Sequence, residues 1–158
     1  MSGMRSDTRL SFLCDRNLGK LARWLRLMGF DTVYLRTNEP EGMRRAADEG
    51  RVILTRKASV RGDRVVHIGH DRLSDQVRQL AGVCDLTQGP GAFTRCCLCN
   101  EILTGMARED ARGKVPEYVY ATRESFSRCP RCGRIYWRGT HHDRASIRMQ
   151  ALLKGGRT

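Results

Sequence analysis

The sequence lacks any long apolar run. None of its stretches approaches the roughly 20 consecutive apolar residues that a membrane-spanning helix needs. The start, Met1–Arg9, is polar and has no apolar segment typical of a secretory signal peptide. Internal repeats and low-complexity tracts are absent as well. We therefore expect a soluble, cytoplasmic protein with no membrane partner.

Carboxylates are scarce relative to cations. Asp and Glu number 17 against 29 Lys and Arg, which gives a formal net charge of +12. Such an excess of cations favours a polyanionic partner, most simply a nucleic acid. The composition is otherwise that of a globular protein, with 40% hydrophobic and 29% charged residues. It excludes a disordered tail, a collagen and a coiled coil.

Short apolar runs alternate with amphipathic segments in the first half. The predicted strands lie at 10–14, 32–35, 51–55 and 65–68, and the predicted helices at 17–28, 41–49 and 71–83. This alternation predicts an α/β fold in which a parallel sheet is flanked by helices. Functional sites of such sheets form at the carboxyl ends of the strands. Asp15 and the pair Arg56-Lys57 stand directly after two of the predicted strands.

The alternation stops at Gln88-Gly89-Pro90-Gly91. We predict an α/β domain over 9–88, a β-rich unit over 92–142, and a C-terminal helix or tail over 143–158. Within the β-rich unit, strand-like pieces lie at 101–103, 118–121 and 134–137, and a terminal helix is predicted over 144–154.

Two C-x-x-C pairs lie in the second half. Four thiolates at this spacing predict one zinc ion bound by Cys96, Cys99, Cys129 and Cys132. Four cysteine ligands leave no open coordination position, so the ion is structural. Asn100 and Gly133 follow the two pairs and suit a backbone with positive φ. Cys97 is a competing ligand for Cys96, whereas Cys14 and Cys84 are expected to be buried thiols.

Aromatic and basic residues surround the second cysteine pair. Their combination is what base stacking and phosphate contact require, and it predicts nucleic-acid contacts at Arg131, Arg134, Trp137, Arg138 and His141. Trp137 also suits the small core of the β-rich unit, and both roles stay open.

Three features act together as a signature. They are the segment Phe12–Arg26 with Gly29–Thr32, the segment Ile53–Arg56, and the two cysteine pairs followed by Tyr136–His141. Together they resemble the Mut-seven C-terminal RNase domain family over about residues 9–142. The resemblance implies a PIN-like nuclease domain that carries a zinc ribbon and cleaves RNA, whether tRNA, mRNA or ribosomal RNA. It also implies a catalytic Mg²⁺ or Mn²⁺ ion, with Asp15 as the first acid and Glu39 or Glu41 as a further one.

Position 57 departs from the family's pattern. After Thr55-Arg56 the family has an Asp, and this chain has Lys57. An ammonium group cannot bind a metal ion and repels one held at Asp15, although it can itself lie against Asp15 in the place of the cation. Asp15 also suits the role of a helix N-cap, and Glu41 that of an ordinary acid in the first turn of a helix.

Three functions therefore stay open. The first is a metal-dependent endoribonuclease in which Arg16, Lys20 and Arg23 hold the RNA backbone. The second is a non-catalytic RNA- or ribosome-binding protein on the same scaffold, which the basic charge and Lys57 favour. The third is a DNA-binding zinc-ribbon protein.

Overall fold

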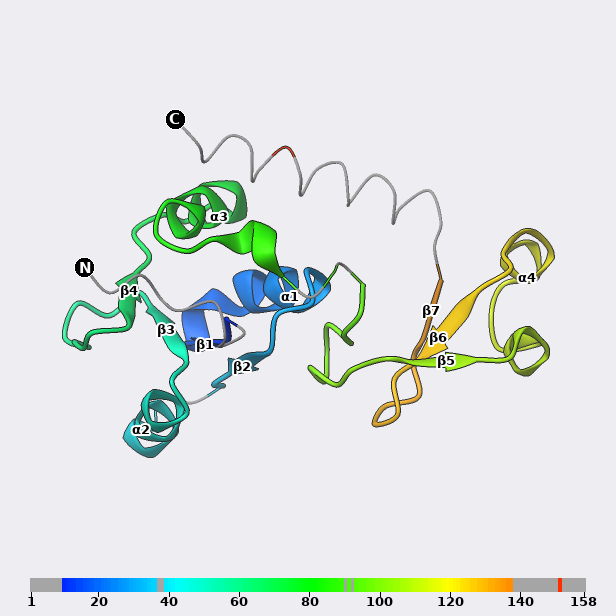
Figure 1. Ribbon diagram of the computed structural model, residues 1–158, viewed down its shortest axis with the longest axis horizontal. Coiled ribbons are helices and arrows are strands. Elements are labelled where there is room, and N and C mark those ends of the chain that lie inside the picture. The colour runs from blue at the N-terminus through cyan, green and yellow to red at the C-terminus, as the bar shows by residue number, and fades with distance from the viewer. Residues whose placement is uncertain (1–9, 37–38, 90, 92, 138–150, 152–158) are drawn as a thin grey trace.

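Two separate sheets organise the chain (Figure 1). The computed structural model describes residues 10–36, 39–89, 91, 93–137 and 151. The first sheet has four parallel strands in the order β2-β1-β3-β4, and the second has three antiparallel strands in the order β5-β6-β7. The predicted fold class, a parallel sheet flanked by helices with a C-terminal β-rich unit, is confirmed.

The strands and helices of the first sheet follow the predicted alternation. The strands are β1 (Phe12–Cys14), β2 (Thr32–Tyr34), β3 (Val52–Thr55) and β4 (Val65–His67). The helices are α1 (Gly19–Leu27), α2 (Pro40–Asp48) and α3 (Leu73–Ala81), and a 3-10 turn over Arg16–Leu18 precedes α1. Each predicted element is present, and its bounds lie within a few residues of the expected ones.

The two faces of the parallel sheet are covered by different helices. Phe12 and Cys14 of β1 pack in one buried cluster with side chains of α1 and α3, including Leu25 and Leu80. The residue between them, Leu13, points to the other face and packs with side chains of β3 and α2. Burial on both faces explains why β1 and β3 are continuous apolar runs rather than alternating ones.

The order of the parallel strands creates a switch point between β1 and β3. The chain leaves β1 toward β2 on one side and later returns to β3 on the other side. Ligand sites of open α/β sheets lie at such a point, beyond the carboxyl ends of the strands. Asp15 follows β1 and Arg56 follows β3, so the structure places both at this edge, as predicted.

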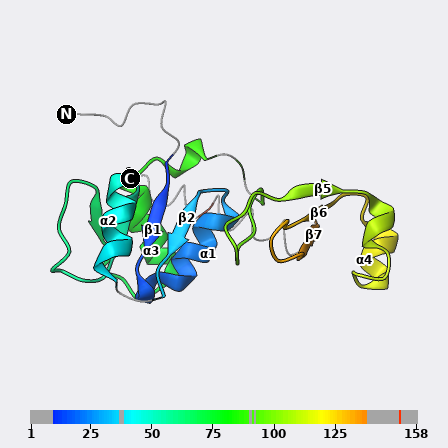
Figure 2. The same cartoon turned by 90° about the horizontal axis from the view of Figure 1, so that it is seen from below.

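The second sheet is built from β5 (Thr104–Met106), β6 (Phe126–Arg128) and β7 (Ile135–Trp137). We call this sheet and the two cysteine loops the ribbon. Between β5 and β6 lie a 3-10 turn (Arg108–Ala111) and helix α4 (Glu117–Thr122), at the end of the ribbon that is farthest from the parallel sheet (Figure 2). The core of this unit is small, because only Ala111, Val119 and Phe126 are buried in its apolar cluster. Trp137 is half-buried and packs against that cluster.

One of the strand predictions in this half is wrong, and another is met only in part. The segment 118–121 is helical and belongs to α4, which begins after the extended residue Pro116 (φ −55°, ψ 144°). Proline disfavours an internal helical position but suits a helix start, so it determines where this helix begins. Within the strand-like piece expected at 101–103, Ile102 forms a β-bridge with Arg95, and β5 begins after it at Thr104. The strand β6 was not predicted.

The chain between the two sheets packs tightly against the end of α1. Gly29 has φ +94°, and a Cβ atom there would lie 2.2 Å from the carbonyl oxygen of Gly91. The Phe93 amide donates a hydrogen bond to the Leu27 carbonyl. The linker is therefore held by close backbone contacts rather than by side chains alone.

Some predictions fall outside these observations. The exact domain limits 9–88, 92–142 and 143–158 stay predictions, as does the cytoplasmic location. The helix predicted over 144–154 lies outside the described residues, apart from residue 151. No helix in the part of the chain that the structure describes has the length and apolar character to cross a bilayer.

Candidate metal centre and nucleic-acid surfaces

Four cysteine sulfur atoms gather where the two cysteine pairs meet. The Sγ atoms of Cys96, Cys99, Cys129 and Cys132 all lie within 4.8 Å of one another. The Sγ atoms of Cys96 and Cys132 are 3.8 Å apart. A tetrahedral site with Zn–S bonds of about 2.3 Å has sulfur atoms about 3.8 Å apart, so the spacing fits this ion. The four cysteines can hold a zinc ion, and Cys97 is not part of the group.

The two cysteine loops have the same backbone design. In the first knuckle, residues 96–101, the Asn100 amide donates to the Cys96 carbonyl over 2.9 Å. In the second knuckle, residues 129–134, the Gly133 amide donates to the Cys129 carbonyl over 2.9 Å. Asn100 has φ +67° and Gly133 has φ +77°. The left-handed conformation predicted after each pair is therefore present, and Asn and Gly are the residues that adopt it at least cost.

A tyrosine from β7 reaches the sulfur cluster. The Tyr136 hydroxyl lies 3.1 Å from the Sγ atom of Cys96 and 3.7 Å from that of Cys97. Burial of the Cys96 thiol acts to raise its pKa, but hydrogen bonds from Tyr136 and from nearby backbone amides lower that pKa to about 7. Burial and the contact with Cys96 raise the pKa of Tyr136 above its ordinary value. Sequence reasoning placed Tyr136 in the segment that follows the second cysteine pair, but it did not predict this contact with the sulfur atoms.

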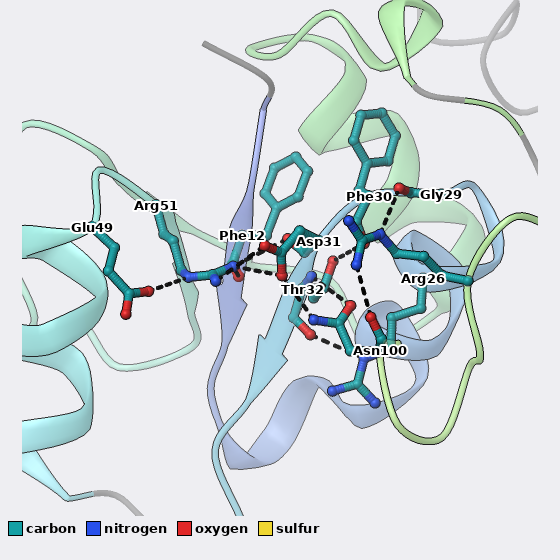
Figure 3. A network of polar contacts seen from close by, with 10 residues as sticks. Phe12, Arg26, Gly29, Phe30, Asp31, Thr32, Glu49, Arg51 and Asn100 are labelled. Atoms are coloured by element: carbon teal, nitrogen blue, oxygen red, sulfur yellow. Dashed lines mark hydrogen bonds and ion pairs between the residues drawn. The ribbon is translucent and has the colours of Figure 1, made fainter. Parts of the chain in front are cut away.

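The first knuckle is docked on the parallel sheet. The guanidinium group of Arg26, at the end of α1, donates to the carbonyl oxygens of Cys97 and Leu98 over 3.1 Å each. Its Nε atom donates to the Thr32 carbonyl over 2.9 Å. A second arginine, Arg95, belongs to the ribbon side of the contact, and its Nε atom donates to the carbonyl oxygen of Gly29, which follows α1, over 3.1 Å. These contacts fix the ribbon to α1 and to the start of β2. Figure 3 shows Arg26 beside Thr32 and Asn100.

Asn100 is the centre of the docking contacts. Its Oδ1 atom accepts from the Thr32 amide over 3.0 Å, and its Nδ2 atom donates to the Asp31 carboxylate over 2.7 Å. The same carboxylate forms a two-pronged ion pair with Arg51, with distances of 3.0 and 3.2 Å. Partial burial acts to raise the pKa of Asp31, but the hydrogen bonds from Arg51 and Asn100 outweigh it and lower that pKa below its ordinary value of 3.8. Asp31 is therefore ionised at neutral pH, and its stabilising contribution is lost only as the pH falls below 3.8 through the folded-state pKa.

The second knuckle faces solvent. Cys132 is exposed, and so are the side chains of three arginines around it, Arg128, Arg131 and Arg134. None of the three forms an ion pair with another residue in the described part of the chain. We call these three residues the second-knuckle surface. It contains the predicted contacts Arg131 and Arg134, whereas Arg138 and His141 lie outside the described residues.

Asp15 is enclosed by hydrogen bonds at the carboxyl edge of the parallel sheet. Its side chain has no solvent exposure. Its Oδ2 atom accepts from the Thr55 hydroxyl over 2.7 Å and from the Arg56 amide over 2.9 Å. Its Oδ1 atom accepts from the Asn17 amide over 2.9 Å, which makes Asp15 the N-cap of the turn before α1. The capping role considered from the sequence is therefore present.

The other two acids proposed for a catalytic metal lie at the start of α2. Glu39 is the residue before the helix and Glu41 is in its first turn, and both are exposed. Among the described residues, the four cysteines form the only group of three or more potential ligands within this spacing. Asp15, Glu39 and Glu41 thus do not assemble into a three-carboxylate group, and these residues as arranged do not fit a Mg²⁺ or Mn²⁺ ion.

Lys57 does not occupy the place of a cation at Asp15. Its side chain is exposed, and no ion pair joins it to Asp15 in the described residues. Its backbone amide donates to the Thr55 hydroxyl oxygen over 3.0 Å. The suggested contact between Lys57 and Asp15 is therefore not found, because backbone amides and the Thr55 hydroxyl already satisfy the carboxylate.

Exposed cations lie on the turn that follows Asp15 and on α1. Arg16, Lys20 and Arg23 occupy the turn before α1 and the outer side of α1, and all three are exposed. None of them forms an ion pair within the described part of the chain. We call these three residues the α1 basic face. Arg56, in contrast, is engaged, because its guanidinium group pairs with Asp71 over 2.7 Å.

Comparison with known proteins yields one match. A family model described as the Mut7-C RNAse domain matches residues 10–149, which is most of the chain. No curated protein and no solved structure matches the chain.

Proposed function

The chain belongs to the Mut7-C RNAse domain family, and from this premise we propose that it binds RNA on an RNase scaffold without cleaving it. The family indicates an RNA-acting, nuclease-like role. The observation that favours binding over cleavage is the enclosure of Asp15, which is buried and already accepts three hydrogen bonds. A carboxylate in that state supports the local backbone instead of presenting oxygen atoms to a metal ion.

Binding would use the two groups of unpaired cations. The α1 basic face begins at the turn after Asp15 and continues along α1, and the second-knuckle surface lies on the ribbon. Exposed guanidinium and ammonium groups gain affinity for RNA mainly by releasing the cations condensed on its phosphates. Neither group of side chains must break an ion pair within the described residues before it contacts a phosphate.

The four cysteines would support this role through one structural zinc ion. Thiolates suit zinc, and four of them complete its coordination, so the ion supplies folding energy and no open position for chemistry. It would hold the loop that carries Arg131 between Cys129 and Cys132. The small apolar cluster of the ribbon makes such support necessary.

Metal-dependent RNA cleavage is the second candidate, and family membership is the observation that favours it. It would assign catalytic roles to Asp15 and to Glu39 or Glu41 in a PIN-like site. The described carboxylates do not fit the ion as they stand, and Lys57 introduces a positive charge at the position of an acid. RNA binding without cleavage is therefore the better supported function.

Paired arginine and lysine replacements test this proposal. We expect Arg131→Gln with Arg134→Gln, and separately Lys20→Gln with Arg23→Gln, to weaken RNA binding. Each pair should reduce the slope of log affinity against log salt by about 1.4, because each lost contact with single-stranded RNA removes about 0.7. Fluorescence anisotropy of a labelled RNA over a range of salt concentrations measures the slope.

The matched control is Arg44→Gln with Arg45→Gln on α2, which removes the same charge from two exposed positions on the opposite face of the sheet. The control should leave the salt slope unchanged. Equal losses in all three double variants would show that net charge alone attracts RNA, and that these surfaces are not the binding sites. Competition with DNA of the same sequence at one stated salt concentration tests the DNA-binding alternative.

A further inference from the structure

We infer that zinc binding by the ribbon and folding of the α/β unit are thermodynamically linked through Asn100, a positioning residue between the first knuckle and β2. The inference rests on the proposed zinc ion. It concerns the stabilisation that this ion gives to the parallel sheet, although its four ligands lie outside that sheet. The linkage follows a continuous series of contacts from the cysteine loop to the amino ends of three strands (Figure 3).

The first step is the conformation of Asn100 itself. It stands directly after Cys99 and adopts φ +67°. Its amide closes the cysteine loop through the hydrogen bond to the Cys96 carbonyl. Because a zinc ion bound by Cys96 and Cys99 favours this closed loop, it also fixes the direction in which the Asn100 side chain leaves the backbone.

The second step is the contact with β2, which is an edge strand of the parallel sheet. The side chain of Thr32 has no solvent exposure, and its amide donates to Asn100 Oδ1. The Asn100 side chain thus supplies an acceptor where an edge strand has no neighbouring strand. Without it, an amide at a buried position loses its hydrogen bond, and an unsatisfied buried donor is strongly disfavoured.

The third step carries the contact across the sheet. Asn100 Nδ2 donates to Asp31, and Asp31 pairs with Arg51. Arg51 also donates to the Phe12 carbonyl over 3.3 Å, and it directly precedes β3. The Phe12 amide in turn donates to the Asp31 carbonyl. The amino ends of β1, β2 and β3 therefore share one polar network that begins at the knuckle.

The second knuckle shows that a knuckle does not itself need this side chain. Gly133 has the equivalent place in the loop, with φ +77° and the same hydrogen bond to the first cysteine. A Cβ atom at Gly133 would make only an ordinary contact, 3.6 Å from the Arg128 side chain. The first knuckle, which is docked on the sheet, thus has asparagine at position 100, whereas the exposed second knuckle has only glycine at the equivalent position 133. The difference between the two knuckles is the contact with the sheet.

The consequence is reciprocal. If zinc stabilises the α/β unit through Asn100, then removal of the Asn100 side chain must weaken zinc binding by the same factor. Coupling between sites in proteins is typically 5- to 150-fold. Two hydrogen bonds from one side chain, one of them to a carboxylate, place the expected factor at about tenfold.

The two tryptophans allow a direct test on the full chain. Trp24 is buried in α1, and Trp137 lies in the ribbon, so Trp137→Phe leaves Trp24 as the reporter of the α/β unit. We expect a zinc chelator to lower the melting temperature of the Trp24 transition by roughly 5–10 °C in this background. Glycine tolerates the positive φ at position 100, so Asn100→Gly removes the side chain without straining the backbone. Added to this background, it should at least halve the shift in melting temperature and weaken zinc binding about tenfold.

The matched control is Gly133→Asn, which places the same side chain in the knuckle that is not docked. It should leave both the Trp24 shift and the zinc affinity unchanged. Amide hydrogen exchange at Thr32 gives a second readout that needs no replacement of Trp137. Zinc should increase protection of this amide in the natural sequence and not in Asn100→Gly.

Two failures are distinguishable. If metal analysis finds no zinc in the natural protein, the linkage and the proposed structural zinc are both wrong. If zinc binds but its removal leaves the Trp24 transition and the Thr32 exchange rate unchanged, the linkage is wrong and the proposed function stands. An Asn100→Gly protein that retains the full shift would also overturn the role given to Asn100.

Discussion

Replacement of Cys129 by serine is expected to release zinc and unfold the ribbon. Cys129 is buried and is one of the four cysteines whose sulfur atoms can hold the ion. A structural zinc ion contributes roughly 10–16 kcal/mol of apparent binding free energy in small zinc domains. The apolar cluster of the ribbon has only three buried members and cannot compensate for such a loss. Metal analysis of the purified variant and amide exchange at Phe126 measure the two effects.

Cys97→Ser is the control for this change. Cys97 lies next to a ligand but outside the four-sulfur group, and its sulfur is 3.7 Å from the Tyr136 hydroxyl. The variant should retain one zinc ion per chain and the folded ribbon. Zinc retained by Cys129→Ser would show that Cys129 is not a ligand, and zinc lost from Cys97→Ser would show that Cys97 is one.

Asp15→Ala is expected to destabilise the α/β unit by about 3–5 kcal/mol, because three hydrogen-bond donors lose their acceptor at a buried site. The donors are the amides of Asn17 and Arg56 and the hydroxyl of Thr55. Asp15→Asn should cost less, since it keeps one acceptor oxygen. Urea unfolding in the Trp137→Phe background, followed by the fluorescence of Trp24, measures both values.

Asp63→Ala provides the comparison for an exposed acid. Asp63 lies in the loop before β4 and is exposed. Its replacement should change the free energy of unfolding by no more than about 0.5 kcal/mol. If Asp15→Ala is as stable as the natural protein, Asp15 does not hold the sheet edge together, and a chemical role for its carboxylate becomes the better explanation.

The parallel sheet could be predicted from the sequence because its signals are local. Apolar runs such as Val52–Leu54 are strands buried on both faces, and Gly29 and Gly50, each with positive φ, follow the ends of α1 and α2. The grouping of the four cysteines was predictable for the same reason, since two residues between thiols fix each loop. Only the bounds of the elements moved, and by a few residues.

The ribbon was less predictable because its elements are short. Residues 118–121 contain tyrosine and valine, which favour strands, but tertiary packing overrides that weak preference. Val119 is the one buried residue of α4 and packs with Phe126, a contact made across a loop. The three-residue strand β6 has too little sequence to show a period.

The docking of the ribbon could not be predicted at all. Asn100 and Asp31 are 69 residues apart, and neither lies in a motif that indicates the contact. The same holds for Arg26, whose guanidinium group binds the backbone of the first knuckle more than 70 residues away. Long-range polar contacts depend on how two finished units meet, and local sequence patterns carry no information on that.

For the carboxylate site, the positions of the acids could be predicted from the sequence, but their neighbours in space could not. The position of Asp15 at the carboxyl edge followed from the strand pattern, but its hydrogen-bond partners did not. Sequence reasoning could name the acids Glu39 and Glu41 without showing whether they approach Asp15. The structure leaves them exposed at the start of α2, outside any group of three ligands in the described residues.

The most direct measurement incubates one labelled structured RNA with the natural protein and with Asp15→Asn, each with and without Mn²⁺. Binding and cleavage are followed in the same samples at several salt concentrations. We expect tight, salt-sensitive binding by both proteins and no cleavage by either. Cleavage by the natural protein that requires Mn²⁺ and disappears in folded Asp15→Asn would contradict this conclusion and establish the carboxylate site as a working nuclease centre.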